Sequence, residues 1–144
     1  MGFLGLPFLF VGCKKGEVQG IQIGETLFAH QDLKENKEMV KAISQVLNGD
    51  EKGLSTLTNF DCGGGAGCYD LGFVLTQLVY EVGEAEFVEM AKQIEKDKLG
   101  LLAGLVRVGL EYGYNDKDGE RDEEELDEAL PQLAKFLTES SINY

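Results

Sequence analysis

The sequence has little of what catalytic and zinc sites usually need. It contains one histidine, His30, and three cysteines. His30 lies in a polar stretch, no serine stands in a nucleophile-elbow context, and the carboxylates occupy positions expected to face solvent. A structural zinc site takes four ligands of the cysteine or histidine type, which is as many as the whole chain holds. We therefore expect no catalytic residues and no zinc.

Basic residues are also scarce. The chain carries 13 lysines and arginines against 26 acidic residues, a formal net charge of −13. Such a charge repels nucleic-acid phosphates and anionic lipid surfaces and favours basic proteins or cations. Residues 111–144 hold eleven acids and three bases, so −8 of this charge lies in the last quarter of the chain. This excess predicts either a solvated face or a surface for a basic partner, and it disfavours nucleic-acid binding.

The apolar stretches are too short to span a bilayer as a helix, which takes about 20 residues. The first twelve residues carry no charge and are followed by Cys13, Lys14 and Lys15. An apolar segment of this length fits the core of a signal peptide. Phe10, Val11, Gly12 and Cys13 resemble the lipobox of a bacterial lipoprotein signal, in which a small residue precedes the lipidated cysteine.

This resemblance implies that residues 1–13 are a signal segment and that Cys13 carries an acyl anchor. The membrane would then be contacted through the lipid alone, and the domain would face an oxidising compartment as a periplasmic or surface protein. The alternative is that residues 3–11 form a buried strand, which Pro7 would place at a sheet edge. In that case the protein is cytoplasmic.

Two prolines and a hydrophobic fraction of 43% are typical of a globular domain. From residue 36 onward, apolar residues recur at intervals of three and four, the spacing of amphipathic helices. Pro131 predicts a kink or break near residues 127–131. Helices are predicted near residues 36–47, 50–59, 70–82, 84–96, 99–110 and 122–138, and Asn48 with Gly49 is expected to end the first of them.

The predicted fold is therefore all-α, a small bundle or stack of five to six helices in a domain at residues 36–144. An extended N-terminal segment precedes it, with a linker at 14–35 and one brief strand at Ile21 and Ile23. Asp70 is expected to stabilise the N-terminus of its own helix. Gly100 and Gly104, four residues apart, are expected to let a neighbouring backbone approach closely.

Residues 61–70 read DCGGGAGCYD. A phosphate-binding loop would end in lysine and a hydroxyl residue, whereas Cys68, Tyr69 and Asp70 follow these glycines. A thiol phosphatase would need an arginine where Cys68 stands. We expect the loop to shape a junction between two helices. Two alternatives are open for its cysteines. They form a Cys62–Cys68 disulfide, which export would favour, or they are two reduced thiols packed as small apolar groups.

The acidic stretch 114–125, YNDKDGERDEEE, resembles part of an EF-hand calcium loop when Gly119 is placed at the turn glycine. Tyr114 then stands at the first ligand position, which is normally aspartate. The alternative is a solvated turn whose acids cap the following helix. The candidate calcium ligands are Asp116, Asp118, Glu120, Asp122 and Glu125.

Charge and compartment together favour an envelope-tethered, acidic, helical binding protein. An immunity or inhibitor lipoprotein that neutralises a basic protein fits these requirements, because negative charge accelerates encounter with a basic target. One alternative is a non-catalytic structural lipoprotein or weak calcium-binding helical domain, with calcium as its only cofactor. Another is a cytosolic helical domain of unknown role.

Overall fold

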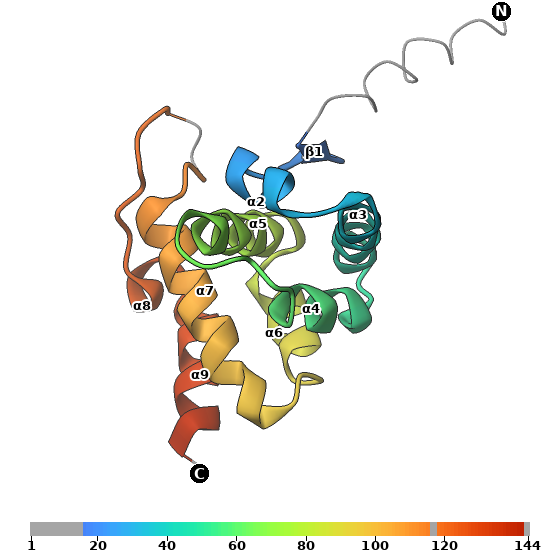
Figure 1. Ribbon diagram of the computed structural model, residues 1–144. Coiled ribbons are helices and arrows are strands. Elements are labelled where there is room, and N and C mark those ends of the chain that lie inside the picture. Colours follow the sequence, from blue (N-terminus) through green and yellow to red (C-terminus); the bar gives the residue numbers. More distant parts are fainter. Residues whose placement is uncertain (1–15, 116–117, 143–144) are drawn as a thin grey trace, which may run out of the picture.

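The computed structural model describes residues 16–115 and 118–142. Within these residues the fold is mainly α-helical, with eight α-helices, one short 3-10 helix and a two-stranded hairpin (Figure 1). The predicted helical class is confirmed, and the helix count exceeds the predicted five to six. The elements are β1 (Glu17–Val18), β2 (Ile21–Gln22), α2 (Glu25–His30), α3 (Leu33–Leu47), α4 (Glu51–Thr58), α5 (Ala66–Val82), α6 (Glu84–Ala91), η2 (Lys96–Lys98), α7 (Leu99–Tyr112), α8 (Leu126–Ala129) and α9 (Pro131–Ile142).

The segment predicted as a linker, 14–35, is folded wherever the structure describes it. β1 and β2 pair antiparallel, with Val18 opposite Ile21, and α2 follows directly. Ile21, Ile23 and Leu27 are buried in the same hydrophobic cluster as the later helices. Because burying these side chains removes apolar surface from water, residues from 16 onward are part of the domain and not a tether.

α3 begins at Leu33, three residues before the predicted start, because Asp32 caps it. The Asp32 carboxylate accepts the backbone N–H of Glu35 at 2.8 Å, and the Glu35 carboxylate accepts the N–H of Asp32 at 3.3 Å. This reciprocal pair is a capping box. At its other end α3 stops before Gly49, whose φ of +80° suits glycine, and this confirms the predicted stop.

α5 and α7 cross at the centre of the molecule (Figure 1). Gly72 and Gly109 let their backbones meet: a Cβ on Gly109 would collide with the backbone of Gly72 and lie 2.7 Å from Cγ2 of Thr76. The prediction of a close approach at Gly100 and Gly104 is wrong, since a Cβ at either would meet nothing within 4 Å. The close approach of α5 and α7 therefore depends on Gly72 and Gly109, each of which faces the other helix.

The last predicted helix is two helices, α8 and α9, with Leu130 between them and Pro131 as the first residue of α9, which confirms the predicted break. Its first turn is not helical, because residues 122–124 run along the end of α7. Their backbone N–H groups donate to the carbonyls of Gly113, Glu111 and Leu110 at 2.9, 3.0 and 3.1 Å. The stretch thus satisfies carbonyls that α7 leaves without an internal donor.

α9 is attached to α6 through a side chain. Oε2 of Glu84, the first residue of α6, accepts the backbone N–H groups of Gln132 at 2.8 Å and Leu133 at 3.1 Å. α6 itself ends at Ala91, earlier than the predicted residue 96. In the ranges 16–115 and 118–142, no helix has the length and apolar character needed to cross a bilayer.

Candidate protein-binding face

Two of the predicted site residues, Cys13 and Asp116, lie outside the described residues. The lipidation of Cys13 and the role of Asp116 as a calcium ligand therefore stay predictions. The other candidates fall in two places, the glycine loop between α4 and α5 and the acidic stretch between α7 and α8.

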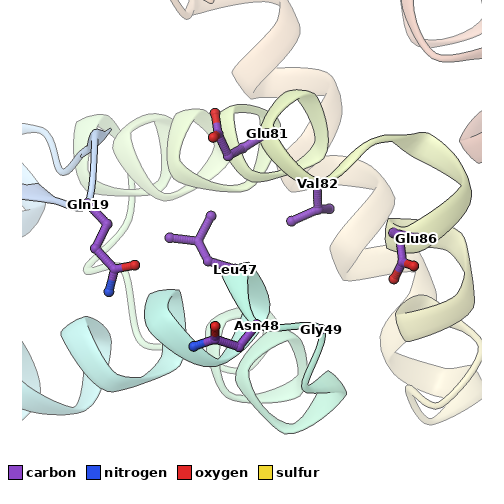
Figure 2. Close-up of a pocket in the computed structure, with 7 residues that line it drawn as sticks. All are labelled: Gln19, Leu47, Asn48, Gly49, Glu81, Val82 and Glu86. Carbon is purple, nitrogen blue, oxygen red and sulfur yellow. The ribbon is translucent and has the colours of Figure 1, made fainter.

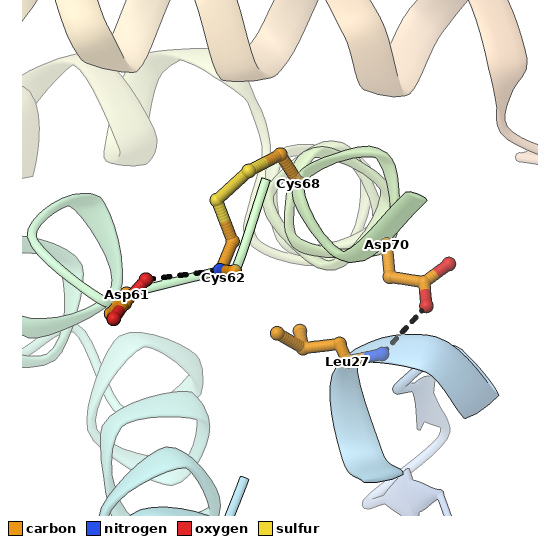
Figure 3. The surroundings of a disulfide bond; sticks show 6 residues. Leu27, Asp61, Cys62, Cys68 and Asp70 are labelled. Carbon is orange, nitrogen blue, oxygen red and sulfur yellow. Dashed lines mark hydrogen bonds between the residues drawn. A yellow bond between two sulfur atoms is a disulfide. The ribbon is translucent and has the colours of Figure 1, made fainter. Parts of the chain in front are cut away.

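Cys62 and Cys68 form a disulfide across the glycine loop (Figure 3). Between them, Gly63, Gly64 and Gly65 all have positive φ, a conformation that L-residues with a Cβ rarely adopt. Asp61 closes the turn by accepting the N–H of Gly63 at 3.0 Å. The loop therefore shapes the junction between α4 and α5, and of the two states considered for its cysteines the structure has the disulfide.

Asp70, near the N-terminal end of α5, also holds α2 in place. Oδ2 of Asp70 accepts the backbone N–H of Leu27 at 3.0 Å, so Asp70 caps α2 and not its own helix, which begins at Ala66 (Figure 3). His30, predicted in a linker, lies against the glycine loop: a Cβ on Gly63 would be 2.8 Å from its Cε1. These contacts hold α2 against α5 and the glycine loop.

The acidic stretch does not form the predicted ligand cage in its described part. Among residues 16–115 and 118–142, no group of three or more histidine, cysteine or acidic side chains is placed to hold a metal. Asp118 accepts the N–H of Glu120 at 2.8 Å, and Glu125 precedes α8 without a side-chain cap. Asp122 points at Asn115, whose backbone N–H and Nδ2 donate to its Oδ2 at 2.7 and 2.8 Å.

Asn115 connects this loop to the centre of the molecule. Its Oδ1 accepts a hydrogen bond from Oγ1 of Thr76 at 2.9 Å, and Thr76 is fully buried on α5. Asp122, Asn115 and Thr76 thus form a chain of side-chain hydrogen bonds from the loop into the core. Sequence reasoning missed this chain, although a threonine within the apolar run of α5 was a signal for it.

Aromatic residues gather on the same side as this network. The rings of Tyr69 and Tyr112 stack with centroids 4.6 Å apart, and Arg121 lies over Tyr112 at 5.4 Å. Phe73 and Tyr114 meet edge to face at 6.3 Å. Tyr69 and Tyr114 are each 44% exposed and Tyr80 is 47% exposed. We call the set of Tyr69, Phe73, Tyr80, Tyr112 and Tyr114 the tyrosine face.

Carboxylates lie near two tyrosines of the tyrosine face, Tyr80 and Tyr112. Burial first, and then the charges of Glu124, Asp122 and Glu84, raise the pKa of Tyr80 above its ordinary 10.0. The charge of Glu111, the largest cause, raises the pKa of Tyr112. Both phenols therefore stay protonated, and able to donate a hydrogen bond, to a higher pH than an ordinary tyrosine.

The tyrosine face was not predicted from the sequence. On α5, Tyr69, Phe73, Thr76 and Tyr80 follow one another at intervals of three and four residues, which places them on one side of the helix. A stronger apolar stripe on the same helix, at Leu71, Val74, Leu75 and Leu78, conceals that interval. The available signal was the position of the tyrosines, since four of the five in the chain lie between residues 69 and 114.

Comparison of the chain with models of protein families, with curated proteins and with solved structures gave no match.

Proposed function

We propose that this protein binds a basic protein at the tyrosine face while an acyl chain at Cys13 tethers it to the cell envelope. It would act as an immunity or inhibitor protein acts, by covering its target and not by catalysis. The observation that carries the proposal is the exposure of Tyr69, Tyr80 and Tyr114 on a chain of net charge −13, with the carboxylates of Glu124, Asp122 and Glu84 near Tyr80.

The chemistry of the face supports a protein partner. Tyrosine and arginine are enriched among the residues that contribute most to protein–protein binding, because rigid rings bury a large area and keep a polar tip. A lysine or arginine from the partner can lie on an exposed ring while the neighbouring carboxylates neutralise its charge. The long-range negative field would increase the rate of encounter with a basic target.

The test is capture of a basic protein from the native envelope fraction at low salt, with two double variants compared. Tyr69→Ser with Tyr114→Ser removes two exposed rings from the tyrosine face. Leu33→Ser with Leu101→Ser removes two exposed apolar side chains elsewhere, since Leu33 is 71% and Leu101 48% exposed. We expect the tyrosine variant to lose about 30-fold in affinity, the loss of about 2 kcal/mol typical of a central aromatic residue.

The leucine variant should keep the wild-type affinity. Equal losses in both variants, or recovery of no basic protein by the wild type, would overturn the proposal. Intact mass of the protein from its native membrane fraction tests the tether separately: acylation adds mass at Cys13, and the Cys62–Cys68 disulfide removes two hydrogens. A cysteine at residue 13 without an acyl chain would remove the envelope part of the proposal.

A further inference from the structure

α3 has an exposed side whose charge is opposite to the net charge of the chain. Its buried side chains belong to the hydrophobic core: Met39, Ala42, Ile43 and Val46. Counted at about 100° per residue, the opposite side of the helix presents an arc of about 120° that holds no acidic residue. The arc carries three exposed lysines, two exposed apolar residues and a serine: Lys34, Lys37, Lys41, Leu33, Val40 and Ser44. We call this arc the lysine face.

The three lysines keep their charge without acidic partners. Side chains three and four positions apart are neighbours on a helix, so Lys37 repels both Lys34 and Lys41. In the ranges 16–115 and 118–142, none of the three forms a salt bridge. The glutamates of α3, Glu35 and Glu38, lie on the side toward α4, where both line a groove with residues of that helix. The lysine face is therefore a positive surface on a chain of net charge −13.

Two apolar side chains lie among these lysines. Leu33 is 71% and Val40 42% exposed. Helices that lie on a lipid surface combine these two kinds of residue, because apolar side chains enter the boundary between headgroups and acyl chains while lysines contact anionic phosphates. A nucleic-acid backbone would meet the charges but leave the apolar side chains in water. The combination therefore favours an anionic lipid surface.

The lysine face lies beside the point where the chain leads back to Cys13. β1 packs against α3, and Nε2 of Gln19 in the hairpin turn donates to Oγ of Ser44 at 2.8 Å. Gln19 also lines a pocket with residues 47–49 at the end of α3 (Figure 2). Gly16, just before β1, follows Cys13 by three residues, and three residues span at most about 11 Å. The two residues between them are lysines, which add positive charge next to the anchor.

Most of the excess acidic charge lies away from the lysine face. α7 and the acidic residues 118–125 are on the other side of α5 from α3 (Figure 1). Exposed charges separated by more than about 10 Å are largely screened at 0.1 M salt. The net charge that repels an anionic membrane therefore acts weakly at the lysine face. A molecule lying on this face would direct α7, and with it the tyrosine face, away from the lipid.

We propose that the lysine face lies on an anionic lipid surface, with Leu33 and Val40 among the headgroups and the three lysines on the phosphates. This contact adds to the acyl chain, which the sequence predicts as the only contact with the membrane. The inference rests on the proposed function for the anchor at Cys13, which would bring the membrane to this side of the molecule.

The chain contains no tryptophan, so a single introduced tryptophan is a unique fluorescent reporter. Leu33→Trp places it on the lysine face, and Leu101→Trp places it at an exposed position of α7. The acylated full-length variants are bound to vesicles of brominated phosphatidylcholine, either alone or with an equal part of phosphatidylglycerol. We expect the emission of the residue 33 reporter to move to shorter wavelength and to be quenched at least about twofold on the anionic vesicles only. The residue 101 reporter should be unaffected on both.

Neutralising the lysines tests the role of charge. In the Leu33→Trp background, quenching should be abolished by the triple variant Lys34→Gln, Lys37→Gln and Lys41→Gln, because each lysine near an anionic surface contributes about fivefold to binding. Quenching should persist in a matched control that neutralises three exposed lysines elsewhere: Lys92→Gln, Lys96→Gln and Lys135→Gln. Salt at about 1 M, where the screening length is about 3 Å, should also abolish the quenching.

Several results would overturn the lipid contact. These are quenching of both reporters, quenching on both kinds of vesicle, no quenching at all, or equal loss in both lysine triples. A shift of the residue 33 emission that needs only a higher protein concentration would assign the face to a second copy of the chain. A shift that polyglutamate produces and anionic vesicles do not would assign it to an acidic protein. Either assignment would overturn the lipid contact as well.

The proposed function can fail separately. If the native chain carries no acyl group at Cys13, the tether is overturned, and quenching of the unacylated chain on the same vesicles still decides the lipid contact. Failure to capture any basic protein, with quenching intact, overturns the binding function and not the lipid contact.

Discussion

At the scale of single residues, Asp122 determines where the acidic loop lies. Its carboxylate accepts two hydrogen bonds from Asn115, and Asn115 reaches the buried hydroxyl of Thr76. A carboxylate predicted as a metal ligand is therefore an internal acceptor that holds the loop on α5. Polar groups that are partly buried cost free energy when a partner is removed, so this chain of hydrogen bonds should be measurable as stability.

Asp122→Ala should lower the free energy of unfolding by about 1–3 kcal/mol, because two donors of Asn115 lose their acceptor. Glu120→Ala, in the same loop but exposed, should change it by less than about 0.5 kcal/mol. Asp122→Asn keeps an acceptor oxygen and should fall between the two. Urea denaturation of the three variants measures this order, and equal stability of Asp122→Ala and Glu120→Ala would contradict it.

Tyr80 makes stability depend on pH at the alkaline end. Because burial and nearby carboxylates raise its pKa above 10.0 in the folded protein, the unfolded chain releases this proton first as pH rises. The unfolded state then binds fewer protons than the native state, so the free energy of unfolding decreases as pH rises beyond 10.0. Below that pH the contribution is constant.

Denaturation curves on both sides of this pH, with tyrosinate absorbance followed in parallel, test the sign. Tyr80→Phe should flatten the decrease, and Tyr112, whose pKa is raised by Glu111, should leave a residual slope. Stability that increases with pH through this range in the wild type, or an unchanged slope in Tyr80→Phe, would show that the field around Tyr80 is not the one described.

At the scale of elements, the contact between α5 and α7 positions the tyrosine face. Tyr69 and Phe73 on α5 meet Tyr112 and Tyr114 at the end of α7 only because the two backbones come together at Gly72 and Gly109. Side chains also join elements from outside their own helix, since Asp70 caps α2 and Glu84 caps α9. Each cap needs a partner far away in the sequence.

Two glycine substitutions on α7 should have opposite effects on the stability of the protein. Gly109→Ala would place a methyl group against the backbone of Gly72, and overpacking of this kind costs about 1–3 kcal/mol. Gly104→Ala has open space and should gain up to about 1 kcal/mol, because alanine is the better helix former. The melting temperature should therefore fall for Gly109→Ala and rise for Gly104→Ala. Shifts of the same sign would contradict the close contact between Gly109 and Gly72.

At the scale of the whole molecule, the net charge of −13 opposes compaction. The salt bridges of Lys92 with Glu89 and of Arg121 with Glu123 both join exposed side chains, so they offset little of this repulsion. Binding a basic partner would relieve the repulsion as well as form contacts. The same argument predicts that screening by salt alone stabilises the free protein.

The melting temperature should rise as sodium chloride is increased from about 0.01 M to 0.1 M, because the screening length falls from about 30 Å to about 10 Å. Potassium chloride should act equally at the same ionic strength. A melting temperature that falls with salt would mean that attractive charge pairs dominate. A larger rise with calcium chloride at matched ionic strength would indicate specific binding of calcium, which the sequence of the acidic stretch suggests.

Local patterns in the sequence were enough to predict the helical class, the stop of α3 at Gly49 and the break at Pro131. Each depends on residues that are neighbours along the chain: apolar intervals of three and four, a glycine with positive φ, and a proline without an N–H. The disulfide was predicted as one of two states, since the cysteines are six positions apart but only the fold brings the sulfur atoms together.

Tertiary structure decided the rest, because it depends on which surfaces meet. Gly109 and Gly104 are alike in sequence, yet only Gly109 faces the backbone of another helix. Nothing in the sequence distinguishes Asp122 from the acids around it, and only the fold places Asn115 beside its carboxylate. The tyrosines form one face only because α5 and α7 cross. Periodicity along the chain shows which side of a helix is apolar, whereas packing between helices determines which polar and aromatic groups become neighbours.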